Sequence, residues 1–154
     1  MKQLFTLILI AIICIIIFTG CNTFQQTKPT TASATPDINL DYIVLKEWKI
    51  NDSNSVGVDI LINEDLNNLT KKELINFITA ISIDKKYASV NIYSTPKAYQ
   101  EANNNNYGTA YNNGFILSYV KDTTNSSKEK INEITWQQKK GTFSNLFKTK
   151  TKLD

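Results

Sequence analysis

The 154-residue chain contains no histidine and no arginine, and it has only two cysteines. Histidine is the one side chain whose unperturbed titration lies near neutrality, so Ser-His-Asp and Cys-His triads are excluded, as are zinc sites with a histidine ligand. Without arginine, the planar guanidinium that holds phosphate or carboxylate through two hydrogen bonds is missing as well. Since only Asp, Glu, Lys, Tyr, Ser and Thr remain for catalysis, we expect a protein that is not an enzyme and holds no metal or other cofactor.

A strong charge of either sign is also missing. Seventeen lysines stand against 14 acidic residues, which gives a formal net charge of +3. Binding of nucleic acid needs a concentrated basic face, so we expect no nucleic-acid partner. Asn, Ile and Lys are abundant, a composition typical of an AT-rich genome and thus of a low-GC Gram-positive bacterium.

The N-terminus carries the most informative motif of the chain. Lys2 precedes a strongly apolar run from residue 4 to 17, and Phe-Thr-Gly-Cys follows at positions 18–21. A basic residue, a short apolar stretch and small residues before a cleavage point are the parts of a secretory signal peptide. Because a cysteine follows directly, the segment resembles a bacterial lipobox, although Phe18 stands where leucine is commoner. The resemblance implies cleavage between Gly20 and Cys21 and a diacylglyceryl group on the Cys21 thiol.

Two other interpretations of this segment stay open. A transmembrane helix needs about 20 apolar residues, whereas the run from 4 to 18 has 15 and no basic cluster follows it. Plain secretion would leave Cys21 as a lone thiol, because Cys14 is lost with the signal. We therefore predict a lipoprotein that its lipidated cysteine holds in the bilayer, on the outer, extracytoplasmic face of the cell membrane.

The chain divides into four predicted segments. Residues 1–20 form the signal peptide, and 21–39 form a lipidated tether that is rich in Gln, Thr, Ser, Ala and Pro and is typical of a flexible linker. Residues 40–141 form the folded domain, and 142–154 form a Lys-rich tail. Removal of the signal leaves 134 residues, which is enough for one domain with one core.

Within the domain, the clearest element is a helix that begins after Thr70. Thr70 and Glu73 have the spacing of a capping box, in which each side chain bonds the backbone N–H of the other residue. Leu74, Phe77, Ile78 and Ile81 follow at the spacing of one helical face. Pro96 can open a second, short helical turn that ends near residue 102.

Strand patterns surround these helices. β-Branched and aromatic residues predict strands at 42–50, 56–62, 87–94 and 115–121, and 131–138 fits a strand slightly better than a helix. Val56, Val58, Ile60 and Ile62 alternate onto one face, which should be the buried one. Asn112-Asn113-Gly114 predicts a turn before the fourth strand. Together the patterns predict an α+β fold: a two-layer sandwich with a mostly antiparallel sheet of about four or five strands and one main amphipathic helix.

Three stretches of this domain resemble small domains of bacterial lipoproteins that have no established activity. The stretches are Tyr42–Lys46, then Val58–Ile60 running into Thr70–Leu74, and Val90–Tyr93. Within residues 42–120, the likeness consists in where the hydrophobic residues and the helix-capping residues stand in the sequence. It implies this fold and an envelope location, and it implies no catalytic residue.

Candidate functional residues fall into three groups. Glu64, Asp65 and Glu101 could pair as the two carboxylates of a glycosidase, although their neighbourhoods indicate solvated loops. Asp59 lies in mid-strand on the face opposite the apolar stripe, where it could line a ligand groove or simply pair with a lysine.

The third group is aromatic. Tyrosine offers apolar area with a polar tip, so a surface for a glycan or peptide could use Tyr93, Tyr99, Tyr107, Tyr111 and Tyr119. Ordinary packing explains such residues equally well, and we retain Asp59, Tyr93 and Tyr119 as weak binding-surface candidates.

In the tail, Lys148, Lys150 and Lys152 could contact anionic lipid or remain solvated, and the apolar residues of 143–147 should pin the tail to the domain.

These observations predict a membrane-anchored, non-enzymatic module that binds an unidentified envelope macromolecule. A protective role, such as immunity or exclusion of an incoming phage, plasmid or bacteriocin, is a narrower version of this hypothesis. The alternative is a cell-wall glycan hydrolase that uses paired carboxylates.

The lipid anchor makes the first testable prediction. In a Gram-positive host grown with radiolabelled palmitate, the wild-type protein should be labelled and should fractionate with the membrane. Cys21→Ala should lose both properties, because it removes the thiol that carries the lipid. An unlabelled protein that stays in the membrane would show that residues 4–18 are themselves the anchor. An unlabelled soluble protein would contradict both the lipid anchor and the transmembrane anchor.

Overall fold

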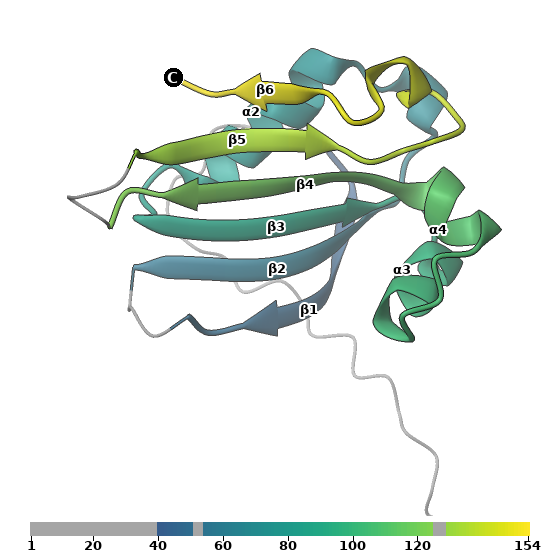
Figure 1. Ribbon diagram of the computed structural model, residues 1–154, viewed down its shortest axis with the longest axis horizontal. Coiled ribbons are helices and arrows are strands. Elements are labelled where there is room, and N and C mark those ends of the chain that lie inside the picture. Colours follow the sequence, from purple (N-terminus) through teal and green to yellow (C-terminus); the bar gives the residue numbers. More distant parts are fainter. Residues whose placement is uncertain (1–39, 51–53, 125–128) are drawn as a thin grey trace, which may run out of the picture. The chain divides into compact units, whose positions relative to one another are not determined.

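A computed structural model describes residues 40–50, 54–124 and 129–154 (Figure 1). The predicted signal peptide and tether, including Gly20 and Cys21, lie outside the described residues. No helix in the described part of the chain is both long and apolar enough to cross a bilayer.

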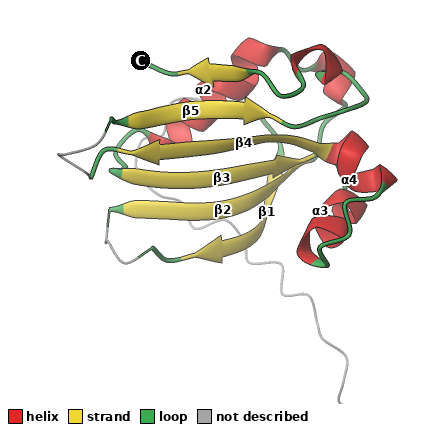
Figure 2. Ribbon diagram, in the orientation of Figure 1, coloured by secondary structure: helices red, strands yellow, loops and turns green. Residues whose placement is uncertain are grey.

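Six strands form a single sheet whose spatial order follows the sequence (Figures 1 and 2). The strands are β1 Tyr42–Trp48, β2 Ser55–Ile62, β3 Tyr87–Tyr93, β4 Phe115–Asp122, β5 Ile131–Trp136 and β6 Lys150–Lys152. Only β2 and β3 pair in parallel, and the other four neighbouring pairs are antiparallel. The α+β class and the mostly antiparallel sheet are therefore confirmed.

The predicted strand number of four or five is wrong, because the C-terminal segment adds a sixth strand. β6 pairs antiparallel with β5, and Thr151 lies opposite Ile134. The indole Nε1 of Trp136 donates to Thr151 Oγ1 at 3.0 Å and holds this short strand in register. Phe143, which precedes β6, is buried in the core. Residues 131–136 form a strand, as the slight preference for that state predicted.

Helix α2, Lys71–Ser82, connects the parallel strands β2 and β3. Its predicted capping box is present: the Glu73 N–H donates to Thr70 Oγ1 at 3.2 Å, and the Thr70 N–H donates to Glu73 Oε2 at 2.7 Å. Two neighbouring backbone donors at the start of the helix are thereby satisfied. The carboxylate of Glu73 accepts the Thr70 bonds in its charged form, which lowers its pKa.

Two shorter helices follow β3. α3 is Pro96–Asn103, as the proline predicted, and α4 is Thr109–Gly114. The turn expected at residues 112–114 is wrong, because these residues form the end of α4. Glu101 on α3 accepts a 2.7 Å hydrogen bond from the Tyr111 N–H, so a contact between the two helices fixes a conformation that the local Asn-Asn-Gly pattern does not indicate.

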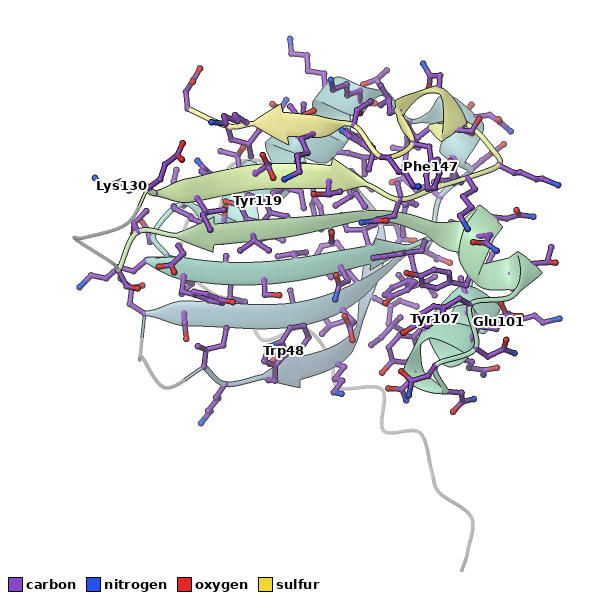
Figure 3. The ribbon with its side chains drawn as sticks, in the orientation of Figure 1. Trp48, Glu101, Tyr107, Tyr119, Lys130 and Phe147 are labelled. Carbon is purple, nitrogen blue, oxygen red and sulfur yellow. The ribbon has the colours of Figure 1, made fainter. Side chains whose placement is uncertain are left out.

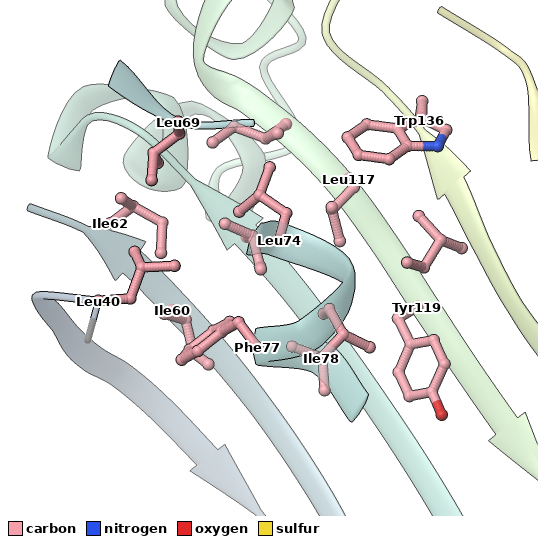
Figure 4. Close-up of a cluster of buried hydrophobic side chains, with 14 of the residues drawn as sticks. Leu40, Ile60, Ile62, Leu69, Leu74, Phe77, Ile78, Leu117, Tyr119 and Trp136 are labelled. Carbon is pink, nitrogen blue, oxygen red and sulfur yellow. The ribbon is translucent and has the colours of Figure 1, made fainter. Parts of the chain in front are cut away.

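The main core lies between α2 and one face of the sheet (Figure 4). Leu74, Phe77 and Ile78 of α2 are at most 1% exposed, and they join the inward residues of β2 to β5 in one cluster. Ile81 packs against the cluster but is only partly buried. Because side chains alternate along a strand, the residues between these inward positions face away from α2.

Candidate binding face

The face of the sheet opposite α2 carries a polar side chain on every strand along a single line of register. We call this set the polar row, and it consists of Lys46, Asp59, Asn91, Ser118, Thr135 and Lys150. Each residue is the register partner of the next, so the row crosses the sheet from β1 to β6. With strands about 4.8 Å apart, the six positions span about 24 Å.

Side-chain hydrogen bonds confirm that neighbours in the row share this face. Asn91 Nδ2 donates to Asp59 Oδ1 at 2.9 Å. Gln137, which follows β5, donates from Nε2 to Ser118 Oγ at 3.5 Å. Lys150 at the far end forms a 2.7 Å ion pair with Glu133. Of these interactions, the one between Asn91 and Asp59 joins two members of the row, and the other two join a member to a polar residue beside it.

Asp59 is the unusual member of the row because it is only 8% exposed. Sequence reasoning placed it on this face but expected a half-exposed carboxylate. Burial raises the pKa of Asp59, while the hydrogen bond from Asn91 and the charge of Lys46 act in the opposite direction. Among the described residues, the bond from Asn91 is its one hydrogen bond. The second carboxylate oxygen has no hydrogen-bond partner in the described residues and is not fully buried, so water or a ligand can reach it.

Trp48 lies beside the row, and the sequence analysis missed it. It is the register partner of Gly57, two residues from Asp59 along β2. A Cβ added at Gly57 would collide with the Trp48 indole, so the ring lies directly over the glycine backbone on the face that carries the row (Figure 3). A glycine within an apolar strand often marks such a close approach, and this signal could have revealed Trp48.

On the other side of the row, aromatic residues gather around α3 and α4. We call this group the tyrosine cluster. Successive ring centroids lie 4.9 to 5.6 Å apart in the order Tyr99, Tyr93, Phe115, Tyr111 and Tyr107. The structure thus brings together four of the five predicted tyrosines, and the rings range from the buried Tyr93 to the 59% exposed Tyr107.

Two members of this cluster lie within electrostatic reach of Asp59. Burial raises the pKa of Tyr93 well above its usual range, and the negative charge of Asp59 raises it further. The same two causes, in the same order, raise the pKa of Tyr99. Phenols are protonated at neutral pH even without such a shift, and both therefore stay neutral O–H groups here.

The fifth predicted tyrosine, Tyr119, lies on the opposite side of the sheet. It is 1% exposed and belongs to the core beneath α2. Its hydroxyl donates to Asn132 Oδ1 at 2.8 Å and lies 3.1 Å from Ser82 Oγ. This network joins α2 to β4 and β5, so Tyr119 stabilises the fold and is not exposed to a partner.

The predicted catalytic carboxylates each accept a bond from the backbone. Glu64 Oε1 accepts from the Asp41 N–H at 2.7 Å, and Asp65 Oδ1 accepts from the Asn67 N–H at 3.0 Å as the N-cap of a 3₁₀ turn, Leu66–Asn68. Glu101 caps the contact between α3 and α4. Each of the three thus has a role in shaping the chain, and no described hydrogen bond joins any two of them.

The lysines of the C-terminal segment lie at or near β6. Lys150 and Lys152 pair with Glu133 and Glu129 at 2.7 and 3.4 Å. Lys148 lies 5.4 Å from the ring centroid of Phe147. Two of these lysines therefore already have acidic partners within the domain.

A separate shallow cleft opens where the turn before α2, the end of α4 and the loop after β5 meet. Gln138 in its wall is fully buried, and its amide donates to the Asn113 carbonyl at 2.7 Å and accepts from the Phe143 N–H at 2.8 Å. Thr142 bonds Asn67 across the cleft at 3.2 Å. Because these polar groups form hydrogen bonds with one another, the cleft is a junction where loops of the domain pack together.

In the ranges 40–50, 54–124 and 129–154, no group of three or more acidic, histidine or cysteine residues is placed to hold a metal ion. Comparison with family models, with curated proteins and with solved structures gave no match. The resemblance to lipoprotein domains therefore stays a prediction, and the functional argument rests on the geometry of this face.

The pH titration of Asp59 tests this geometry. Lys46→Ala removes a charge that lowers the pKa of Asp59, so the titration midpoint of its carboxyl group, followed by carbon-13 NMR, should rise.

The raised pKa in the folded protein also has a consequence for stability. The contribution of Asp59 to the free energy of unfolding should fall as pH rises from the ordinary value of 3.8 through the folded pKa, because the folded state holds this proton more tightly than the unfolded chain does.

Lys72→Ala is the matched control, because Lys72 is an exposed lysine on α2. It should leave the midpoint of Asp59 unchanged. A wild-type midpoint at or below the ordinary value, or equal shifts in the two variants, would contradict the placement of Asp59 beside Lys46 in a desolvated position.

Proposed function

We propose that the chain is a non-enzymatic binding module, held at the outer face of the cell membrane by a lipid on Cys21. In this proposal the domain has two layers: α2 covers one face of the sheet, and the other face binds an envelope macromolecule. The single observation that carries the proposal is the polar row, with the nine-tenths buried Asp59 as its second member.

The energetics of Asp59 support a binding role. Transfer of a carboxylate out of water is costly unless hydrogen bonds or an opposite charge compensate. Among the described residues, Asp59 accepts one hydrogen bond, from Asn91, and its attraction to Lys46 does not offset the effect of burial on its pKa. A partner that donates a hydrogen bond to the second oxygen, in place of solvent, would add to this compensation.

The rest of the row is suited to binding without catalysis. Its members are amide, hydroxyl and ammonium groups, which position a ligand but do not by themselves provide an acid and base pair. The predicted hydrolase would instead rely on Glu64, Asp65 and Glu101, whose carboxylates are engaged with the backbone. No feature of the described residues favours that alternative.

The location at the envelope rests on the sequence motif at residues 18–21. A lipid anchor at Cys21 and an 18-residue linker after it would keep the domain near the membrane while leaving its binding face free to turn toward the wall. A protective role in immunity or exclusion would use the same face against an incoming macromolecule.

Site-specific photo-crosslinking tests which face binds. A photoreactive amino acid at Ser118, in the middle of the row, should give a discrete adduct with an envelope component in the producing cell. The same amino acid at Thr79, an exposed position on α2, should give none, since that surface belongs to the other side of the sheet. Absence of an adduct at Ser118, or the same adduct at both positions, would overturn the proposed function.

A further inference from the structure

The chemistry and spacing of the polar row indicate which class of envelope macromolecule it takes. We infer that the row binds a wall polysaccharide of N-acetylated sugars, laid across the strands from β1 toward β6. This inference rests on the proposed function for its location, and it goes further by naming the ligand.

The spacing of the row is the first argument. Polar groups stand at each strand, about 4.8 Å apart, and extend for about 24 Å without a break. This interval is close to the repeat of one pyranose unit in an extended, β-linked chain. Each successive sugar could therefore face one polar group of the row, whereas a compact small molecule would use only a part of the row.

The charge of the row is the second argument. Lys46 stands beside Asp59, and Lys150 is paired with Glu133, so the surface has no concentrated charge that would favour a polyanion. The central positions, Asn91, Ser118 and Thr135, are neutral and polar. Protein interfaces usually depend on buried apolar anchors, which the centre of the row does not provide.

Aromatic rings on both sides of the row are the third argument. Trp48 lies two residues from the row along the strands on one side, and Tyr93 lies two residues from it on the other. At about 3.4 Å per residue, each is about 7 Å from the row. Trp48 packs over Gly57 and remains partly exposed. Partly exposed rings such as Trp48 and Tyr99 offer flat apolar surfaces for the C–H faces of sugars while the row bonds their polar edges.

Asp59 supplies the specific contact. Its free carboxylate oxygen can accept from a sugar hydroxyl or from the N–H of an acetamido group. Asn91 donates its amide N–H to the other oxygen of Asp59, which leaves the Asn91 carbonyl as a further acceptor. Asp59 is 8% exposed, and its second oxygen is not among the buried atoms that lack a partner in the described residues, so it remains open to a ligand.

Tryptophan fluorescence provides a direct assay with the full chain in mild detergent. The protein has two tryptophans, of which Trp136 is fully buried beneath α2 and Trp48 lies beside the row. Titration with the N-acetylglucosamine tetramer should give a saturable change in emission. Trp48→Phe should abolish this change, because the emission of Trp136 should not respond to a ligand on the opposite face.

Variants of the carboxylate provide the matched comparison. Asp59→Asn keeps the shape of the side chain but replaces an acceptor oxygen with a donor, so the affinity for the tetramer should fall at least tenfold. Asp84→Asn makes the same change at an exposed position in the loop after α2, and the affinity should stay unchanged. Equal affinities of the wild type and Asp59→Asn would overturn the assignment.

Sedimentation with protein-free wall sacculi separates this inference from the proposed function. Binding of both the tetramer and the sacculi, weakened by Asp59→Asn, supports the glycan. Binding of sacculi without the tetramer would overturn the inference in favour of the peptide stems. A protein adduct at Ser118 without binding to sacculi would also overturn it but would leave the proposed function intact, whereas failure of all three assays would remove both.

Discussion

The packing of α2 onto one face of the sheet is the interaction on which the rest of the structure depends. Leu74, Phe77 and Ile78 are almost completely buried against the strands, and burial of each such side chain contributes about 1.5–3 kcal/mol. The capping box at Thr70 fixes where this helix begins. Side chains alternate between the two faces along each strand. Every second strand residue therefore lies on the face that α2 does not cover.

That second face has a consistent organisation. The polar row runs across the strands, Trp48 lies on one side of it, and the tyrosine cluster lies on the other. The short helices α3 and α4 hold the cluster in place through the bond between Glu101 and the Tyr111 N–H. A rigid core on one face thus supports polar and aromatic groups on the other, which is the arrangement that a binding module needs.

Most of the fold could be predicted because its signals are local. The capping box, the apolar stripe of α2 and the alternation in β2 each lie within a few residues of sequence. β6 was missed since Lys-Thr-Lys has no apolar pattern, and its position depends on a bond from Trp136. The polar row was missed except for Asp59, because only the register of six strands brings Asn91, Ser118 and Thr135 into one line. Tyr119 was misplaced among the surface candidates because tyrosine is equally suited to a core that offers its hydroxyl a partner, as Asn132 does.

Hydroxyl-radical footprinting on intact cells, compared with the purified full chain in detergent, tests most directly whether the face opposite α2 is occupied in the envelope. Trp48 should be oxidised in the purified protein and protected on cells. Ile83, which is 59% exposed at the end of α2, should be oxidised equally in both, and the buried Trp136 should be protected in both. Equal oxidation of Trp48 in the two samples, or protection confined to Ile83, would contradict the central claim that the face opposite α2 is the binding surface.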